Sequence, residues 1–186
     1  ETVRCAERGA RGINMTSDPQ DLGSPDLANR AWDPLWEVCA DLQLPVHFHI
    51  GSSNTAMDFY GNYFWESQDE YVKPAIGGSM LFINNARVVI NTVFAGIFDR
   101  FPKLRVGFLE GGATWVPFFM DRLDRSYPHH LQVDIHGEFL PSSKPDVMAS
   151  EYFRRHVKAG RIFVGFDGDD HGLGYAVQEA GNESFV

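Results

Sequence analysis

Cysteine is scarce in this chain, which argues against one class of stabilising or metal-binding site. The 186 residues include Cys5 and Cys39 and no other cysteine, and each lies far from the other in a segment with a helical pattern. Such a pair favours neither a disulfide framework nor a cysteine-type zinc site, and a reducing compartment is the default for a chain of this kind. We therefore expect a cytoplasmic protein.

Basic charge and long apolar runs are lacking as well. The chain has 16 basic and 25 acidic residues, for a net charge of −9, and no basic run. This balance argues against nucleic acid or an anionic membrane as a partner. No segment approaches the roughly 18 apolar residues of a membrane span. Glycine-rich phosphate-binding motifs are also absent. We expect a small-molecule substrate, and a homo-oligomer stays an open alternative.

What is present is the composition of a globular domain. Apolar residues make up 44% of the chain and charged residues 22%, which is enough to build a sizeable core in one domain. Both ends carry patterns that are usually found inside a domain. Glu1 begins within a helical pattern, and the last residues, "GNESFV", begin an expected strand. These features predict an internal piece of a longer protein.

Strand and helix patterns alternate along the chain. Apolar strands are expected in "RGINM", "PVHFHI", "RVGFLEGG" and "RIFVGFDGDD", with helices between them. This alternation predicts parallel strands joined by right-handed crossovers, as in doubly wound sheets and in (β/α)8 barrels. Two long aperiodic stretches, at about 54–78 and 128–148, are expected to be insertions that take part in binding.

Polar residues concentrate where the strands end. His49, Glu110 and Asp167 each close an apolar run, and this placement favours the barrel, whose active sites lie at the carboxyl ends of the strands. His47 and His49 are two residues apart and therefore share one face of their strand. A neutral imidazole at a barrel mouth is a good ligand for a divalent cation. The alternative is that both are hydrogen-bonded core histidines.

Glu110 and the acidic turn at 167–170 leave similar alternatives. Glu110 can ligate a metal or act as a base, but a carboxylate here would also be favoured by the dipole of the following helix, which Thr114 can cap. Asp167, Asp169 and Asp170 lie in a glycine-rich turn. The turn lacks the length and the closing Glu of an EF-hand loop, so we expect a solvated turn rather than a cation site.

Several blocks together resemble a known family. "LPVHFHIG", "GIFDRFPKLRVGFLEGGATWVPFFMDRLDR", "ASEYFRRH" and "RIFVGFDGDD" are similar to segments of the amidohydrolase-related family. This is a group of metal-dependent TIM-barrel hydrolases and decarboxylases that includes aminocarboxymuconate-semialdehyde decarboxylase. The resemblance extends over nearly the whole chain. It implies an α/β fold that is part of a (β/α)8 barrel, roughly from strand 4 to the start of strand 8.

The resemblance also implies roles for His49 and Glu110, and the neighbouring His47 is given a separate assignment. His49 matches the metal-binding histidine at the end of strand 5, and Glu110 matches the catalytic position at the end of strand 6. His47 is assigned to substrate binding. One divalent metal ion is implied, with zinc expected and manganese as the alternative. Further ligands are expected before Glu1, as an HxH or ExH pair, and after Val186, as an aspartate.

Three functions follow from the resemblance. The first is a hydrolase that activates water at a single divalent metal ion. The second is a non-oxidative decarboxylase acting on a cyclic or unsaturated carboxylic acid. The third is an inactive fragment that lacks essential metal ligands.

Overall fold

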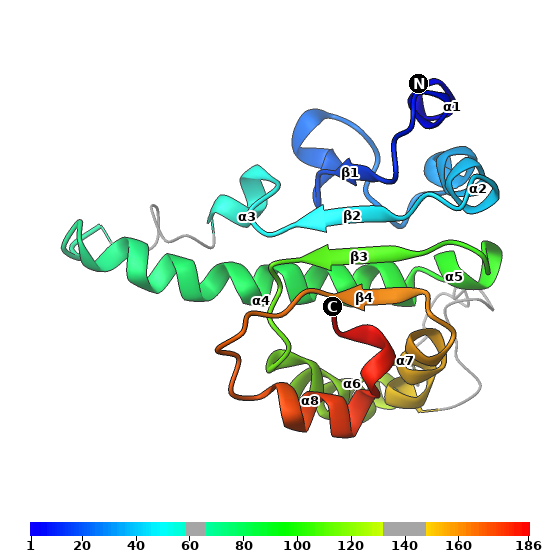
Figure 1. Cartoon of the computed structure of the whole chain (residues 1–186). Coiled ribbons are helices and arrows are strands. Elements are labelled where there is room, and N and C mark those ends of the chain that lie inside the picture. Colours follow the sequence, from blue (N-terminus) through cyan, green and yellow to red (C-terminus); the bar gives the residue numbers. More distant parts are fainter. Residues whose placement is uncertain (59–65, 132–147) are drawn as a thin grey trace.

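The structure is a computed structural model that describes residues 1–58, 66–131 and 148–186. Strands and helices alternate along the chain (Figure 1). The strands are β1 (Ile13–Met15), β2 (Val46–His49), β3 (Val106–Leu109) and β4 (Ile162–Val164). The helices are α1 (Thr2–Glu7), α2 (Asp33–Asp41), α3 (Asn54–Asp58), α4 (Val72–Phe94), α5 (Ile97–Arg100), α6 (Trp115–Leu131), α7 (Ala149–Lys158) and α8 (Leu173–Ala180). Short 3-10 turns are found at Pro19–Leu22, Arg30–Trp32 and Asn182–Ser184.

The four described strands form one parallel sheet in the order β1-β2-β3-β4. Each strand pairs in parallel with the next, for example Val46 of β2 with Val106 of β3. A further parallel bridge joins Val164 to Phe185, where the sequence predicts the start of another strand. Spatial order that follows chain order is the arrangement of a barrel, because a doubly wound sheet reverses its strand order at a switch point. The predicted parallel α/β architecture is confirmed.

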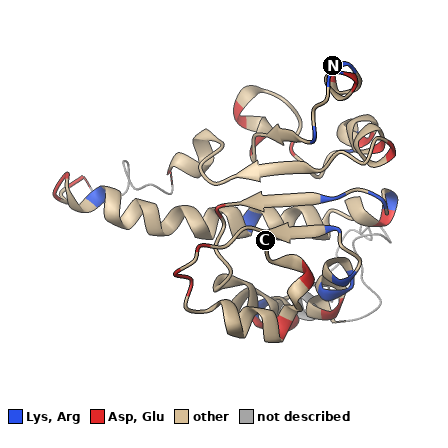
Figure 2. Cartoon of the chain, viewed as in Figure 1, with Lys and Arg blue, Asp and Glu red and all other residues tan. Residues whose placement is uncertain are grey.

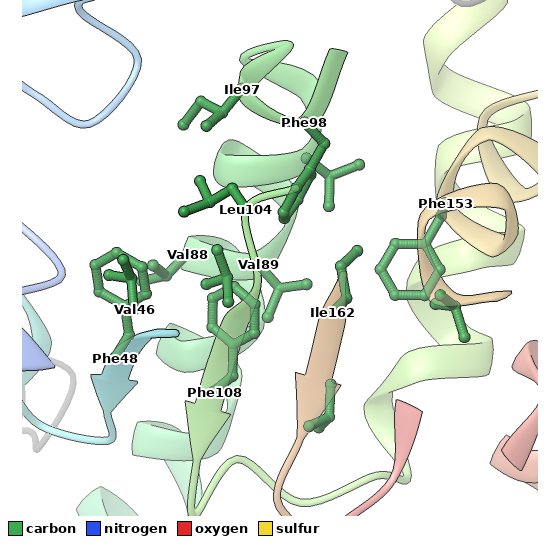
Figure 3. Packing of buried hydrophobic residues seen from close by; sticks show 14 of the residues in the cluster. Val46, Phe48, Val88, Val89, Ile97, Phe98, Leu104, Phe108, Phe153 and Ile162 are labelled. Carbon is green, nitrogen blue, oxygen red and sulfur yellow. The ribbon is translucent and has the colours of Figure 1, made fainter. Parts of the chain in front are cut away.

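The two faces of the sheet have different environments. Val46 and Phe48 share a face with their neighbours on β3 and β4, and these side chains are fully buried. Figure 3 shows Val88 and Val89 of α4 next to them. Burial of each such side chain contributes roughly 1.5–3 kcal/mol relative to exposure. Helices therefore cover one face. The alternate residues of β2, His47 and His49, project from the other face, as strand geometry requires.

The long helix α4 begins within a stretch that the sequence predicts to be irregular. It starts at Val72, within the stretch expected to be an irregular insertion, and ends at Phe94. Gly96 then adopts a left-handed conformation (φ 68°), which separates α4 from the short helix α5. In Figure 1 the first turns of α4 extend past the carboxyl ends of the strands. Residues 59–65 and 132–147 of the two expected insertions lie outside the described residues.

A buried histidine lies in the helix layer, away from the sheet edge. His156 of α7 is completely buried between Phe98 and Tyr152, with ring centroids 5.1 and 4.6 Å away. Arg161 donates to its Nδ1 over 3.0 Å, so the neutral ring carries its proton on Nε2. Burial lowers the pKa of His156 to about 4, and the nearby Asp99 only partly offsets this effect.

His156 should therefore make stability depend on pH in the acidic range. The pKa rises from about 4 in the folded chain to the ordinary value of 6.5 on unfolding, so the unfolded chain binds the extra proton. The contribution of His156 to the free energy of unfolding is fully present above pH 6.5. It falls by about 3 kcal/mol in all as the pH drops to 4. Urea unfolding between pH 4 and 8 measures it. His156→Gln, which cannot titrate, should show a smaller loss over this range, and identical pH profiles would contradict the assignment.

Candidate functional site

The functional residues expected from the sequence gather at the carboxyl ends of the strands (Figure 1). His49 is the last residue of β2, and Glu110 directly follows β3. Strands β2 and β3 are neighbours in the sheet, with His49 in register with Leu109. Figure 2 shows further acidic residues along the loop between β4 and α8. Parallel strands bring the residues that follow them to one edge, and this is where barrel active sites are built.

His49 has a defined tautomer and an accessible ring nitrogen. Its Nδ1 lies 2.8 Å from the carbonyl oxygen of Ile50, which can only accept a hydrogen bond. Nδ1 of the neutral ring therefore carries the proton, and Nε2 keeps a free lone pair. Metal-binding histidines are oriented in the same way, with the second ring N–H donated to a carbonyl or carboxylate. The side chain is 48% exposed.

Glu110 lies opposite this nitrogen. Its Oε1 is 3.5 Å from Nε2 of His49, and its side chain is 65% exposed. The backbone of Glu110 is left-handed, with φ 53°. This conformation costs about 1–2 kcal/mol for a residue with a Cβ. Strain of this kind persists where the surrounding structure holds the backbone in place, and it is common at functional sites.

His47 shares the open face but lies deeper in the sheet. Its ring fills the space beside two glycines: a Cβ at Gly107 would lie 2.5 Å from Nδ1, and one at Gly12 would lie 2.9 Å from Nε2. Burial lowers the pKa of His47, so the ring is neutral at pH 7. Its Nδ1 is buried and has no partner among the described residues. The structure thus brings His49 and Glu110 together and leaves His47 below them.

A buried carboxylate that the sequence analysis did not single out joins the loops after β1 and β2. Asp18 is 1% exposed and accepts from Nη2 of Arg87 at 2.7 Å and from the Ser53 hydroxyl at 2.6 Å. Burial alone would raise the pKa of Asp18, but the hydrogen bonds from Arg87 and Ser53 outweigh it and lower the pKa. This network ties the segment that follows His49 to α4. A cavity of about 390 Å³, lined in part by Thr16 and Ser52, lies beside it.

The acidic turn after β4 is not simply solvated. Asp167 and Asp169 lie at the rim of a cavity of about 570 Å³, whose walls include Phe82, Trp115 and Phe118. Asp170 also lines this cavity, and it bonds to the loop that carries Glu110. The hydroxyl of Thr114 lies at the start of α6 as expected, but it donates to Asp170. The expectation of a solvated turn is therefore wrong for Asp170.

Two groups at this edge are of the kinds that bind divalent metal ions. Nε2 of the neutral His49 ring and the carboxylate of Glu110 are both suitable donors for a divalent transition metal. No group of three or more His, Cys, Asp or Glu residues with metal-binding geometry occurs within residues 1–58, 66–131 and 148–186. The donor set therefore fits a divalent ion but does not complete its coordination.

None of the helices that the structure describes combines the length and the hydropathy needed to cross a membrane.

Comparisons with known proteins identify the fold and the family. The family described as Amidohydrolase matches residues 1–160. A 2-keto-4-carboxy-3-hexenedioate hydratase from Sphingobium sp. (strain NBRC 103272 / SYK-6) is 29% identical over 126 residues, which cover 66% of this chain and 32% of the hydratase. An amidohydrolase from Mycobacterium avium subsp. paratuberculosis K-10 superposes with a TM-score of 0.69 at 19% identity, covering 99% of this chain and 43% of that one.

A third relative is a solved structure with a metal ion. The 5-carboxyvanillate decarboxylase of Novosphingobium aromaticivorans DSM 12444, complexed with manganese and 4-hydroxy-3-methoxy-5-nitrobenzoic acid, superposes with a TM-score of 0.61 at 19% identity. The alignment covers 96% of this chain and 46% of the decarboxylase. This chain thus spans less than half the length of each relative. The structural likeness confirms the predicted fold, part of a TIM barrel, and the family match establishes that the chain belongs to the amidohydrolase family.

Proposed function

We propose that the whole protein is a metal-dependent lyase that releases CO₂ from a small aromatic or unsaturated carboxylic acid. The observation that carries this proposal is the pairing of His49 Nε2 with Glu110 Oε1, 3.5 Å apart at the carboxyl edge of the sheet. The hydrolase expected first from the sequence is not confirmed. One solved relative is a decarboxylase, and one curated relative is a hydratase.

His49 is the proposed metal ligand of this chain. In the neutral ring the bond from its Nδ1 to the Ile50 carbonyl leaves the lone pair on Nε2, and it fixes the orientation of the ring. A divalent metal held by His49 would supply Lewis-acid chemistry toward the substrate. Imidazole and carboxylate donors suit both zinc and manganese. Manganese is the better supported of the two, because it is the ion found in the decarboxylase structure.

Glu110 is the proposed acid/base residue. When CO₂ leaves, the electron pair of the broken C–C bond stays on the substrate carbon, and a proton must be delivered to that carbon. A protonated Glu110 carboxyl can deliver it, and its 65% exposure lets it take up another proton from water afterwards. His47, neutral and deeper on the same face, stays a predicted substrate contact.

A second candidate reaction uses water as a reactant. Water would either add across a carbon–carbon double bond or cleave a hydrolysable bond. The specific observation in its favour is the hydratase at 29% identity. In this case Glu110 would act in its carboxylate form and take the proton from the attacking water. The same two residues serve both reactions, and the protonation state of Glu110 at the start of the cycle differs.

Turnover by the full-length protein tests the proposal. The protein would be stripped with a chelator, reloaded with Mn²⁺, and supplied separately with 5-carboxyvanillate and 2-keto-4-carboxy-3-hexenedioate. We expect CO₂ release from the aromatic acid, at least about 100-fold faster with Mn²⁺ than without. Consumption of the hexenedioate without CO₂ release would instead support the hydration candidate. Turnover of either compound that is unchanged by removal of the metal would overturn both.

A further inference from the structure

The loop from Leu109 to Trp115 is held by hydrogen bonds from α4, from the residue that follows β2 and from within the loop itself. Asn85 of α4 donates to the Leu109 carbonyl over 3.3 Å, and the Ile50 N–H donates to the same oxygen over 3.2 Å. The indole N–H of Trp115 donates to the Gly111 carbonyl over 2.7 Å. The carbonyls of Leu109 and Gly111, on either side of Glu110, thus each accept a hydrogen bond, but neither bond involves Glu110 itself.

Asp170 closes this arrangement from the loop after β4. Its Oδ2 accepts from the N–H of Ala113 at 2.5 Å, and its Oδ1 accepts from the hydroxyl of Thr114 and, over 3.2 Å, from the N–H of Gly172. A Cβ at position 172 would collide with the Thr114 hydroxyl, so only glycine fits there. The Asp170 carboxylate thus joins the loop after β4 to Ala113 and Thr114 of the loop after β3, and we call this set of bonds the clamp.

The clamp acts on the most adaptable part of the loop. Gly111 and Gly112 separate Glu110 from Ala113, and Gly112 is itself left-handed, with φ 66°. Glycines place little restriction on the backbone, so they do not by themselves keep Glu110 at its unfavourable φ of 53°. Once Ala113 and Thr114 are released, the glycines would let Glu110 relax to a negative φ. Its carboxylate would then swing away from His49.

We propose that Asp170 is a positioning residue for Glu110, because its clamp on Ala113 and Thr114 holds the Glu110 carboxylate against the ring of His49. This inference rests on the proposed function only for its effect on turnover. The effect on geometry stands without it. The sequence-based choice between a cation site and a solvated turn is thereby replaced by a third role for this residue.

Two substitutions test the clamp in the full-length protein. Asp170→Ala removes all three acceptor contacts. Asp170→Asn keeps the size of the side chain and leaves one acceptor oxygen, so it serves if the alanine variant does not fold. Asp124→Ala and Asp124→Asn are the matched controls. Asp124 also accepts a backbone N–H, that of Ser150 at 2.8 Å, but it does so in the helix layer between α6 and α7.

Crystal structures of the metal-free variants give the first measurement. In the Asp170 variants we expect a negative φ at Glu110 and a His49 Nε2 to Glu110 Oε1 distance well beyond the present 3.5 Å. In the Asp124 variants both should be unchanged. An unaltered Glu110 in the Asp170 variants would overturn the proposal, whatever their thermal stability.

Kinetics of the Mn²⁺-loaded enzyme give the second measurement. A displaced proton donor should lower kcat of the Asp170 variants by about 100-fold and leave KM within about twofold, because misplacement by 1 Å can cost this much. The Asp124 variants should match the wild type in both constants. A fall in kcat no larger than that of the Asp124 variants would count against the clamp. If the wild type itself has no turnover, the proposed function fails, and the crystal structures still decide the role of Asp170.

Discussion

Replacing His49 by alanine in the full-length protein should weaken Mn²⁺ binding by about 100-fold or more and remove metal-dependent turnover. Loss of a residue that merely orients a ligand already costs about 10–100-fold in metal affinity, so loss of a ligand should cost at least as much. In the neutral ring of His49, Nδ1 bonds to the Ile50 carbonyl, and Nε2 is left with a lone pair that can bind the metal. Titration of the metal-free protein with Mn²⁺, followed by electron paramagnetic resonance, measures the change directly.

The control for this experiment is His171→Ala. His171 is an exposed histidine of the loop between β4 and α8, and no role at the site is proposed for it. The His171→Ala variant should bind Mn²⁺ as tightly as the wild type does. This result would show that the loss in His49→Ala comes from removing a metal ligand and not from removing any histidine. If His49→Ala kept wild-type affinity and turnover, His49 would be a surface histidine, and the metal site would have to lie elsewhere in the protein.

The parts of this structure that could be predicted from sequence are those governed by short periods. Apolar Val46 and Phe48 alternate with His47 and His49, and this period of two places the imidazoles on the face opposite the helices. The strand and helix alternation predicts the parallel sheet, and parallel strands bring the residues after them to one edge. The proximity of His49 and Glu110 follows from these two regularities, although they are 61 positions apart (110 − 49).

The parts that could not be predicted depend on contacts between distant residues with no common pattern. The bond from Ala113 to Asp170 spans 57 positions, and the bond from Arg87 to Asp18 spans 69. A carboxylate in a glycine-rich turn has the same local pattern whether it faces water or a backbone N–H. The left-handed backbone of Glu110 is equally hidden, because this region disfavours a residue with a Cβ. Only the fold shows what holds it there.

Glu110→Gln should separate proton transfer from metal binding. The amide has nearly the size and shape of the carboxyl group, but it cannot deliver or accept the proton. We expect kcat to fall by about 10²–10⁴-fold, the usual contribution of a positioned acid or base. Mn²⁺ affinity should change by no more than about threefold, since the lost interaction is one made in the transition state. Steady-state kinetics and Mn²⁺ titration on the same preparation measure both quantities.

The comparison of Glu110→Gln with His49→Ala decides between two roles for the carboxylate. Its Oε1 is only 3.5 Å from Nε2 of His49, a separation at which a shared metal ion could also contact it. If Glu110→Gln lost Mn²⁺ as strongly as His49→Ala, Glu110 would be a ligand, and the proton would have to come from another residue. If it kept both affinity and kcat, Glu110 would have neither role. Glu37→Gln is the control, since Glu37 is an exposed glutamate of α2, a helix that lies away from the carboxyl edge of the sheet. This variant should leave both Mn²⁺ affinity and kcat unchanged.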